Sequence, residues 1–193
     1  MKLNESQTLL NLAKAFAGEC QDYVRYKFIE YGARYNKHEN IAQIIDKIIY
    51  NEFNHARMFY TFIQNCSKET IEHLEVCTGY PFKQKWNLEE NLLLASEDEH
   101  EQGTVVYPKF ADVARAEGFD EIAELFENIA KIELKHEAIL TRLHEELKNG
   151  TLYKKKSAAT WLCDSCGYSS EGKEPWEICP VCQAERQAIK IEF

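Results

Sequence analysis

Apolar residues recur at intervals of three and four positions through four long segments of the chain, and this spacing is typical of amphipathic helices that bury one face. The segments run over approximately 5–35, 40–65, 88–116 and 120–147. Breaks in the pattern separate them, at 32–40, 66–86, 117–120 and 148–150. The pattern predicts a mainly α-helical protein built on four long helices.

The lengths of the connections predict how these helices are arranged. The first-to-second and third-to-fourth connections are short, so each of those pairs should lie antiparallel and adjacent. The second-to-third connection is long and contains Gly79 and Pro81. A four-helix bundle with one long crossover is the ferritin-like arrangement. We therefore expect a ferritin-like bundle over residues 1–148.

The character of the chain changes after Gly150. A run of three lysines at 154–156 lies in a predicted linker, residues 149–159. Residues 160–193 have turn residues, short apolar stretches and no helical period. A segment this short cannot build a sufficient core without a staple. We expect a small, β-rich, metal-binding domain there.

Composition excludes several classes of protein. The 193 residues are 45% hydrophobic and 28% charged, as in globular rather than disordered chains. A formal net charge of −9 argues against non-specific nucleic-acid binding. The longest apolar runs are too short to span a bilayer. The N-terminus also lacks the basic and apolar regions of a secretory signal, so we expect a cytoplasmic protein.

Four of the 26 glutamates lie in the middle of an apolar helical stripe, where an uncompensated charge is very costly. Residues i±3, i±4 and i±7 share one helical face, and for Glu52 these include Ile45, Ile48 and Phe59. Each predicted helix contributes one such carboxylate: Glu19, Glu52, Glu99 and Glu133. The stripes offer no Lys or Arg at the matching positions, so separate salt bridges do not explain them.

Histidine follows the glutamate by three residues in the second and fourth helices, at His55 and His136. This spacing puts a carboxylate and an imidazole side by side, where both can bind one metal. Two glutamates plus two Glu-x-x-His pairs form the ligand set of di-iron and di-manganese carboxylate bundles. Glu19 and Glu99 are 80 residues apart, and the two histidines 81, so the bundle reads as two copies of one helix pair. Carboxylate-rich coordination favours iron or manganese.

Other candidates have ordinary explanations. A third Glu-x-x-His, Glu97 and His100, lies opposite the apolar stripe and is expected to face solvent. Surface or structural roles are expected for the remaining histidines, His38, His73 and His144. Small packing residues, with redox thiols as the alternative, are expected at Cys20, Cys66 and Cys77.

Two Cys-x-x-Cys pairs lie near the C-terminus, Cys163/Cys166 and Cys179/Cys182. Four thiolates at this spacing close a tetrahedral site without an open position. An odd total of seven cysteines with paired spacing indicates a metal in a reducing compartment rather than a disulfide framework. Taken alone, the site fits a zinc ribbon. Beside a redox-capable dinuclear site, which needs an electron supply, iron is favoured.

The whole chain resembles the rubrerythrin family, with both domains in the family's order. The matching phrases are Phe16-Ala-Gly-Glu-Cys20, Glu52-Phe-Asn-His55-Ala56, Tyr107-Pro-Lys-Phe-Ala111, Ala116-Glu-Gly-Phe119, Glu133-Leu-Lys-His136 and the terminal cysteine pairs. The resemblance implies a ferritin-like di-iron bundle fused to a rubredoxin-like Fe(Cys)4 domain. It implies a peroxidase that reduces hydrogen peroxide to water, with electrons from NAD(P)H through separate redox proteins. It also implies a homodimer, in which the rubredoxin-like iron of one subunit lies near the di-iron site of the other.

The resemblance also assigns roles to individual residues. The six Glu and His residues above match the family's iron ligands, with Glu52 and Glu133 as the bridging carboxylates. Tyr26 and Tyr107 match tyrosines that hydrogen-bond ligand carboxylates.

One position departs from the family pattern. Three residues after Glu99 the family usually has another glutamate, which binds one iron in the oxidised state; that iron moves to the first-repeat histidine on reduction. This sequence has Gln102, a neutral amide and a doubtful ligand. We expect His55 to hold its iron in both states, or the iron shift to be reduced. The alternative is that water or a nearby carboxylate fills the gap.

Two other functions are compatible with parts of the sequence. A ferritin-type protein would oxidise and store iron, but storage needs no appended thiolate domain. A zinc-ribbon interaction module with a vestigial bundle would not need four buried glutamates and two histidines.

Overall fold

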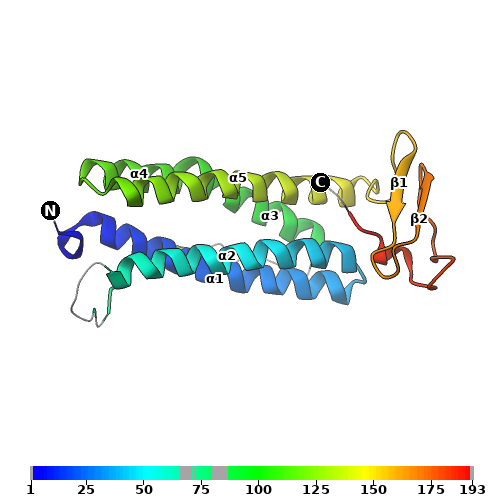
Figure 1. Cartoon of the computed structure of the whole chain (residues 1–193), viewed down its shortest axis with the longest axis horizontal. Coiled ribbons are helices and arrows are strands. Elements are labelled where there is room, and N and C mark those ends of the chain that lie inside the picture. Colours follow the sequence, from blue (N-terminus) through cyan, green and yellow to red (C-terminus); the bar gives the residue numbers. More distant parts are fainter. Residues whose placement is uncertain (1, 66–70, 72, 80–86, 192–193) are drawn as a thin grey trace.

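Helices account for most of the computed structural model, which describes residues 2–65, 71, 73–79 and 87–191 (Figure 1). The helices of the bundle are α1 (Gln7–Tyr35), α2 (Glu39–Asn65), α3 (Leu88–Glu101), the π-helix η2 (Gln102–Val106), α4 (Tyr107–Ala116) and α5 (Asp120–Lys148). The strands are β1 (Ala159–Leu162) and β2 (Ser169–Gly172), and short 3₁₀ turns occur at η1 (Leu3–Glu5) and η3 (Arg186–Ala188).

Local sequence signals define several helix ends. The Ser6 side chain accepts a hydrogen bond from the Leu9 N–H at 3.1 Å at the start of α1. Asn87 does the same for α3, accepting from Glu90 at 3.2 Å. Each bond satisfies a backbone donor that has no partner within the helix. Gly118, between α4 and α5, has a φ of 84°, a conformation that favours glycine.

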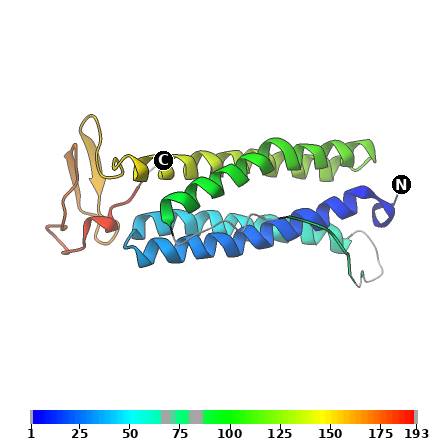
Figure 2. The same ribbon diagram turned by 180° about the vertical axis from the view of Figure 1, so that it is seen from behind.

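The helices pack as two pairs. α1 lies along α2, and the arm formed by α3, η2 and α4 lies along α5 (Figures 1 and 2). Short turns join the members of each pair, and the long connection 66–87 joins one pair to the other. The predicted ferritin-like four-helix bundle is confirmed, because α3, η2 and α4 together form its third helix.

The third helix differs from the prediction of one regular helix over 88–116. The π-helix η2 interrupts it, with the Tyr107 N–H bonding back to the Gln102 carbonyl. A π-turn accommodates one extra residue. The repeat spacing records that insertion: Glu19 and Glu99 are 80 residues apart, whereas the tyrosines Tyr26 and Tyr107 are 81 apart. One inserted residue at η2 therefore accounts for the change of spacing between the two helix pairs.

Two buried apolar clusters fill the bundle, one towards each end. The first includes Tyr26, Ile45 and Leu140 and lies towards the strands. The second includes Leu12 and Phe126 and lies towards the N-terminus. The middle turns of the helices lie between the two clusters, so a polar site placed there is enclosed by dry packing on both sides.

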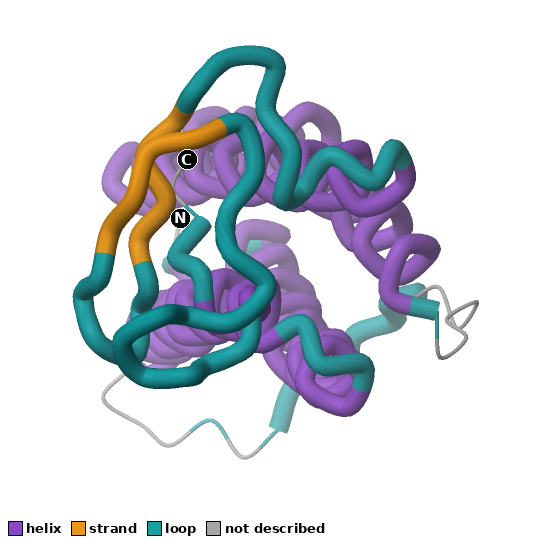
Figure 3. Tube along the Cα trace, turned by 90° about the vertical axis from the view of Figure 1, so that its right-hand side faces the viewer, coloured by secondary structure: helices purple, strands orange, loops and turns teal. Residues whose placement is uncertain are grey.

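The C-terminal segment forms a small antiparallel unit at one end of the bundle (Figure 3). β1 pairs with β2 in a register that places Ala159 opposite Gly172 and Leu162 opposite Ser169. Leu152 is buried in the bundle cluster on that side, and Ile191 packs against the same cluster. The segment predicted as a linker, residues 149–159, thus contains a residue anchored in the bundle.

Candidate metal centres

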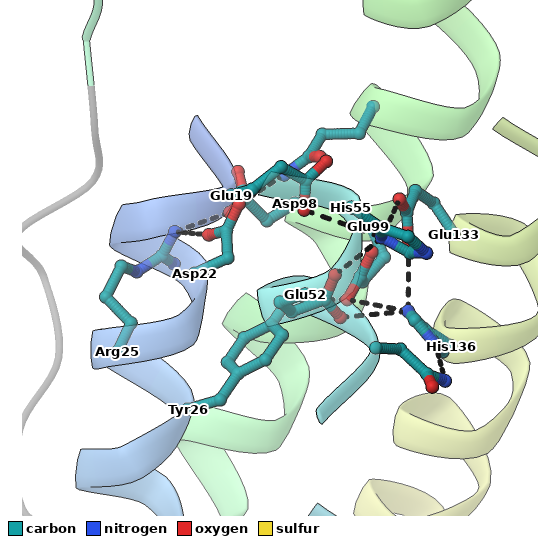
Figure 4. Close-up of polar contacts among 12 residues, drawn as sticks. Glu19, Asp22, Arg25, Tyr26, Glu52, His55, Asp98, Glu99, Glu133 and His136 are labelled. Atoms are coloured by element: carbon teal, nitrogen blue, oxygen red, sulfur yellow. Dashed lines mark hydrogen bonds and ion pairs between the residues drawn. The ribbon is translucent and has the colours of Figure 1, made fainter. Parts of the chain in front are cut away.

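The bundle brings all six predicted Glu and His ligands together halfway along its length (Figure 4). Each comes from the middle turns of a long helix or, for α3, from its last turn. All six side chains are buried, and the four glutamates are at most 1% exposed. Four carboxylates buried in one core must be neutralised by protons or compensated by cations.

The six residues form two groups that share two members. In each group, one ligand atom per residue lies within 4.8 Å of all the others. The groups are Glu19, Glu52, His55 and Glu133, and Glu52, Glu99, Glu133 and His136. Glu52 and Glu133 belong to both, so their carboxylates lie between two adjacent positions for a metal.

The two histidines occupy equivalent places. His55 Nδ1 lies 3.0 Å from Glu52 and 3.1 Å from Glu133. His136 Nδ1 lies 3.0 Å from Glu52 and 2.9 Å from Glu133. Two ligands at right angles, each about 2.1 Å from one ion, are about 3.0 Å apart. The spacing of these atoms therefore fits ligands that share a metal.

Several buried atoms in this cluster lie close to one another but form no well-directed hydrogen bond. They are Glu19 Oε2, Glu52 Oε1, both carboxylate oxygens of Glu133, and His136 Nδ1. Buried polar atoms are almost always satisfied by hydrogen bonds, water or an ion. The unpaired atoms converge on the two positions between the helices, so the donor set fits two metal ions.

Electrostatics couples the carboxylates to the imidazoles. Burial raises the pKa of Glu19 and Glu99 well above the ordinary value, with neighbouring carboxylates adding to the shift. Burial alone would raise the pKa of Glu52 too, but contact with both imidazoles lowers it to about 2. Burial disfavours the charged form of His136, yet Glu133, Glu52 and Glu99 raise its pKa to about 12. Protons on the histidines thus compete with metals for this site.

The two tyrosines hold carboxylates across the bundle. Tyr26 donates to Glu99 Oε1 at 2.7 Å, and Tyr107 donates to Glu19 Oε1. Each tyrosine therefore orients the glutamate of the other helix pair rather than that of its own. Asn51 adds a further contact, since its side-chain amide lies 3.1 Å from His136 Nε2 and leaves Nδ1 to face the carboxylates. Such contacts orient ligands and tune a metal site.

A second polar cluster adjoins the site and was not predicted from the sequence. Asp22 is 2% exposed, accepts a hydrogen bond from Gln102 Nε2 at 2.7 Å, and pairs with Arg25 at 2.9 Å. Arg25 also pairs with Asp98. The available signal was helical spacing, because Asp22 follows Glu19 by three residues and shares its face.

The candidates set aside from the sequence lie away from the cluster. Glu97 and His100 are exposed, as predicted, and His100 contacts Glu137 at 3.0 Å. His144 is buried and lies 2.9 Å from the Glu89 carbonyl, a structural contact. Among the cysteines outside the C-terminal pairs, Cys20 is half-buried, Cys77 is exposed and does not fit the packing role, and Cys66 lies outside the described residues.

The four C-terminal cysteines form a second compact centre. Cys163 Sγ lies 3.7 Å from Cys182 Sγ, and Cys166 Sγ lies 3.7 Å from Cys179 Sγ. Thiolates about 2.3 Å from a tetrahedral ion are about 3.8 Å apart, whereas disulfide sulfurs lie about 2.0 Å apart. The spacing therefore fits a four-thiolate metal site.

The backbone builds two matching turns around these thiols. Gly167 and Gln183, each directly after the second cysteine of a pair, have φ values of 75° and 63°. Their N–H groups bond back to the carbonyls of Cys163 and Cys179 at 2.8 and 3.0 Å. Burial opposes ionisation of Cys179, but backbone N–H groups outweigh it and lower the pKa of this thiol to about 7. A thiol that ionises readily is a better metal ligand.

Across the described residues, none of the helices combines the length and the apolar character needed to cross a membrane.

Comparisons with known proteins cover both parts of the chain. The family model for rubrerythrin matches residues 11–144 and 90–160, and the model for the rubrerythrin rubredoxin-like domain matches residues 161–189. Rubrerythrin of Clostridium perfringens is 37% identical over 180 residues, covering 93% of this chain and 91% of that protein. A putative rubrerythrin of Methanocaldococcus jannaschii is 35% identical over 198 residues, covering 98% and 95%.

Solved structures agree on the fold. Nigerythrin in a mixed-valence state superposes with a TM-score of 0.63 at 23% identity, covering 95% of this chain and 85% of that one. The Glu and His cluster is thus a di-iron carboxylate site, and the four cysteines form a rubredoxin-like site. Because the family model and near full-length relatives span the bundle and the C-terminal domain together, the chain belongs to the rubrerythrin family.

Proposed function

We propose that this protein is a non-haem di-iron peroxidase that reduces hydrogen peroxide to two water molecules with two electrons and two protons. One observation carries the proposal: a buried site with two adjacent, carboxylate-bridged metal positions is joined in one chain to a four-thiolate centre. The first suits two-electron chemistry on an O–O bond. The second suits one-electron supply. We propose that the bundle, residues 1–148, reacts with peroxide. Residues 149–159 connect it to the rubredoxin-like domain, residues 160–193, which delivers electrons.

The ligands divide between the two positions as the geometry groups them. Glu19 and His55 would hold one iron, Glu99 and His136 the other, with Glu52 and Glu133 bridging. When bound, the two irons supply the two electrons that cleave the peroxide bond. The protein's own contribution is to hold these ligands in a dry cage. The apolar clusters on either side exclude bulk water and thereby strengthen every electrostatic contact inside.

His55 is proposed to remain a ligand in both oxidation states. Its Nδ1 already lies 3.0 to 3.6 Å from three ligand carboxylates. Gln102 directs its amide nitrogen to Asp22 and carries no charge with which to attract iron away. Crystals of the oxidised and the reduced protein test this point, and a large displacement of iron towards Gln102 on oxidation would contradict it.

Electron delivery is proposed to run between subunits of a homodimer. From His136 to Lys148, α5 continues for twelve residues, roughly 18 Å, before the rubredoxin-like domain begins. A second subunit running head-to-tail would bring its own thiolate centre nearer. The outer face of α1 and α2 offers an apolar surface for such a partner, at Val24, Phe28, Tyr31, Tyr50 and Phe53, each 47–67% exposed.

The electron donor is proposed to be a rubredoxin-like protein or an NAD(P)H-linked reductase. Such redox partners, and four thiols kept free to bind metal, belong in a reducing compartment. This supports a cytoplasmic location.

The test is a single turnover. The protein is reduced without oxygen, one equivalent of hydrogen peroxide is added, and the visible absorption of the four-cysteine iron is followed. Prompt return of the red ferric spectrum with consumption of peroxide is expected. Cys166→Ser should lose this signal, whereas the exposed Cys77→Ser should keep it as a matched control. A spectrum that stays bleached would contradict the proposal and favour iron oxidation and storage; a protein without colour would favour a zinc-bound module.

A further inference from the structure

The hydrogen bond between Asp22 and Gln102 joins two equivalent positions of the internal repeat. Asp22 follows Glu19 by three residues, and Gln102 follows Glu99 by three residues. Glu19 and Glu99 are 80 residues apart, and so are Asp22 and Gln102, because the extra residue of the π-helix comes after Gln102 in the chain. At equivalent positions of the repeat, the first helix pair therefore has the carboxylate of Asp22 and the second has the amide of Gln102.

Every oxygen of the Asp22 carboxyl group is used. Oδ2 accepts from Gln102 Nε2 at 2.7 Å, and Oδ1 accepts from Arg25 at 2.9 Å. The side chain of Asp22 is 3% exposed and that of Arg25 is 9% exposed, so water contributes little. Arg25 also pairs with Asp98, which anchors the cluster on α3. Asp22 is thus held from both sides in a fixed position next to the metal ligands.

We propose that Asp22 is a positioning residue of the di-iron site: it supplies the carboxylate of this equivalent pair of positions and orients Gln102, and the two positions accept only one carboxylate between them. Asp22 is outside both groups of four ligand atoms, so it acts through Gln102 rather than on metal. A carboxylate accepts hydrogen bonds, and the amide nitrogen of glutamine donates them. Asp22 therefore determines which end of the Gln102 amide faces α1.

The orientation of Gln102 matters because this residue lines a cavity together with Tyr107, which contacts the Glu and His cluster. The cavity has a volume of about 240 Å³ and is lined in part by Gln102, Tyr107, Asp98 and Lys14. Tyr107 also donates to Glu19, so the same wall reaches the ligands. With Gln102 held by Asp22, its side chain adds no charge to a wall that also includes Asp98, Glu101 and Lys14. A second carboxylate there would face the buried Asp22 across a hydrogen-bond distance, and the two could remain together only by taking up a proton.

The inference depends on the di-iron site and not on the peroxide reaction, so it is tested by stability and metal binding. Four chains are compared: the parent, Gln102→Glu, Asp22→Ala, and the double variant Gln102→Glu/Asp22→Ala. Their melting temperatures are measured with the bundle stripped of metal and the cysteine site filled. Manganese(II) binding to the bundle is measured by calorimetry for the same chains and for Asp22→Asn.

Gln102→Glu should lower Tm by roughly 5 °C or more, because it replaces a buried hydrogen bond with two facing carboxylates. Adding Asp22→Ala should restore most of that loss, so the two changes are strongly non-additive. Asp22→Asn can accept only one of the two bonds and should weaken manganese binding about tenfold. Gln64→Glu, the same change at an exposed position on α2, should leave both measurements close to the parent values.

Two results would overturn the inference. A double variant no more stable than Gln102→Glu would mean that the two positions do not exclude each other. Manganese binding as tight in Asp22→Asn as in the parent would mean that Asp22 only stabilises the fold. A double variant that folds when Gln102→Glu does not would support the inference, even without a melting curve for the single variant.

Discussion

Metal binding in the bundle should release at least two protons per chain at pH 7. Contacts with Glu133, Glu52 and Glu99 raise the pKa of His136 to about 12, against the effect of burial. The corresponding contacts with Glu133, Glu19 and Glu52 raise the pKa of His55 far above its ordinary value. Both imidazoles are therefore protonated at pH 7 when the bundle holds no metal. An imidazole binds metal only in its neutral form.

The expected number of protons released on metal binding differs clearly from that of a site with ordinary histidines. Two histidines with the usual pKa of about 6.5 would each be about one-quarter protonated at pH 7 and would release about half a proton together. Here the release is two, and the raised pKa values of Glu19 and Glu99 can only add to it. The product of the two manganese binding constants should then rise at least a hundredfold, roughly, per pH unit between about pH 6 and 8.

Calorimetry measures this number directly. The cysteine site is kept filled, the bundle is stripped with a chelator, and manganese(II) is titrated in two buffers of different ionisation enthalpy. Manganese(II) prefers oxygen and nitrogen ligands, so it should bind in the bundle and not at the four thiolates. His136→Gln should lower the count by about one, whereas the exposed His100→Gln should not change it. A count near one-half in the parent protein would refute the electrostatic reasoning.

Two further substitutions test the support around the site. Tyr26→Phe keeps the ring but removes the bond to Glu99. The free energy of unfolding should fall by about 1.5–3 kcal/mol, and manganese should bind about tenfold more weakly. Urea unfolding of the exposed Tyr35→Phe control should match the parent. Gly103→Ala places a Cβ 2.8 Å from Leu134 Cδ2, so the close approach of η2 to α5 should cost about 1–3 kcal/mol. A Gly103→Ala Tm within a degree of the parent would contradict that close packing.

The sequence was sufficient for the helices and for the ligand types. Helical periodicity is a local property, and four glutamates in apolar stripes can be recognised from neighbours at i±3 and i±4. The same holds for the cysteine pairs, because metal-binding turns are short and local. Each of the six Glu and His residues and the four cysteines lies in the clusters that the sequence predicted.

The change of repeat spacing from 80 to 81 residues was visible in the sequence, but its location was not. The structure places the inserted residue in η2, where Gly103 packs tightly against α5. The position of a π-turn depends on how the helix packs against its neighbour. The extra residue weakens the local hydrogen-bond geometry, and packing against the neighbouring helix compensates for that loss.

Tertiary structure alone decided which partners meet across the bundle. Helical spacing places Tyr26 and Asp22 on the same face as Glu19. In the structure, however, Tyr26 forms a hydrogen bond with Glu99 on α3, and Asp22 forms one with Gln102 on η2. Sequence spacing orders residues along one helix, whereas hydrogen bonds and metal positions depend on the rotation and crossing of two helices relative to each other. The sequence by itself determined which residues form the Glu and His cluster; the packing of the helix pairs determined which side chains contact those residues.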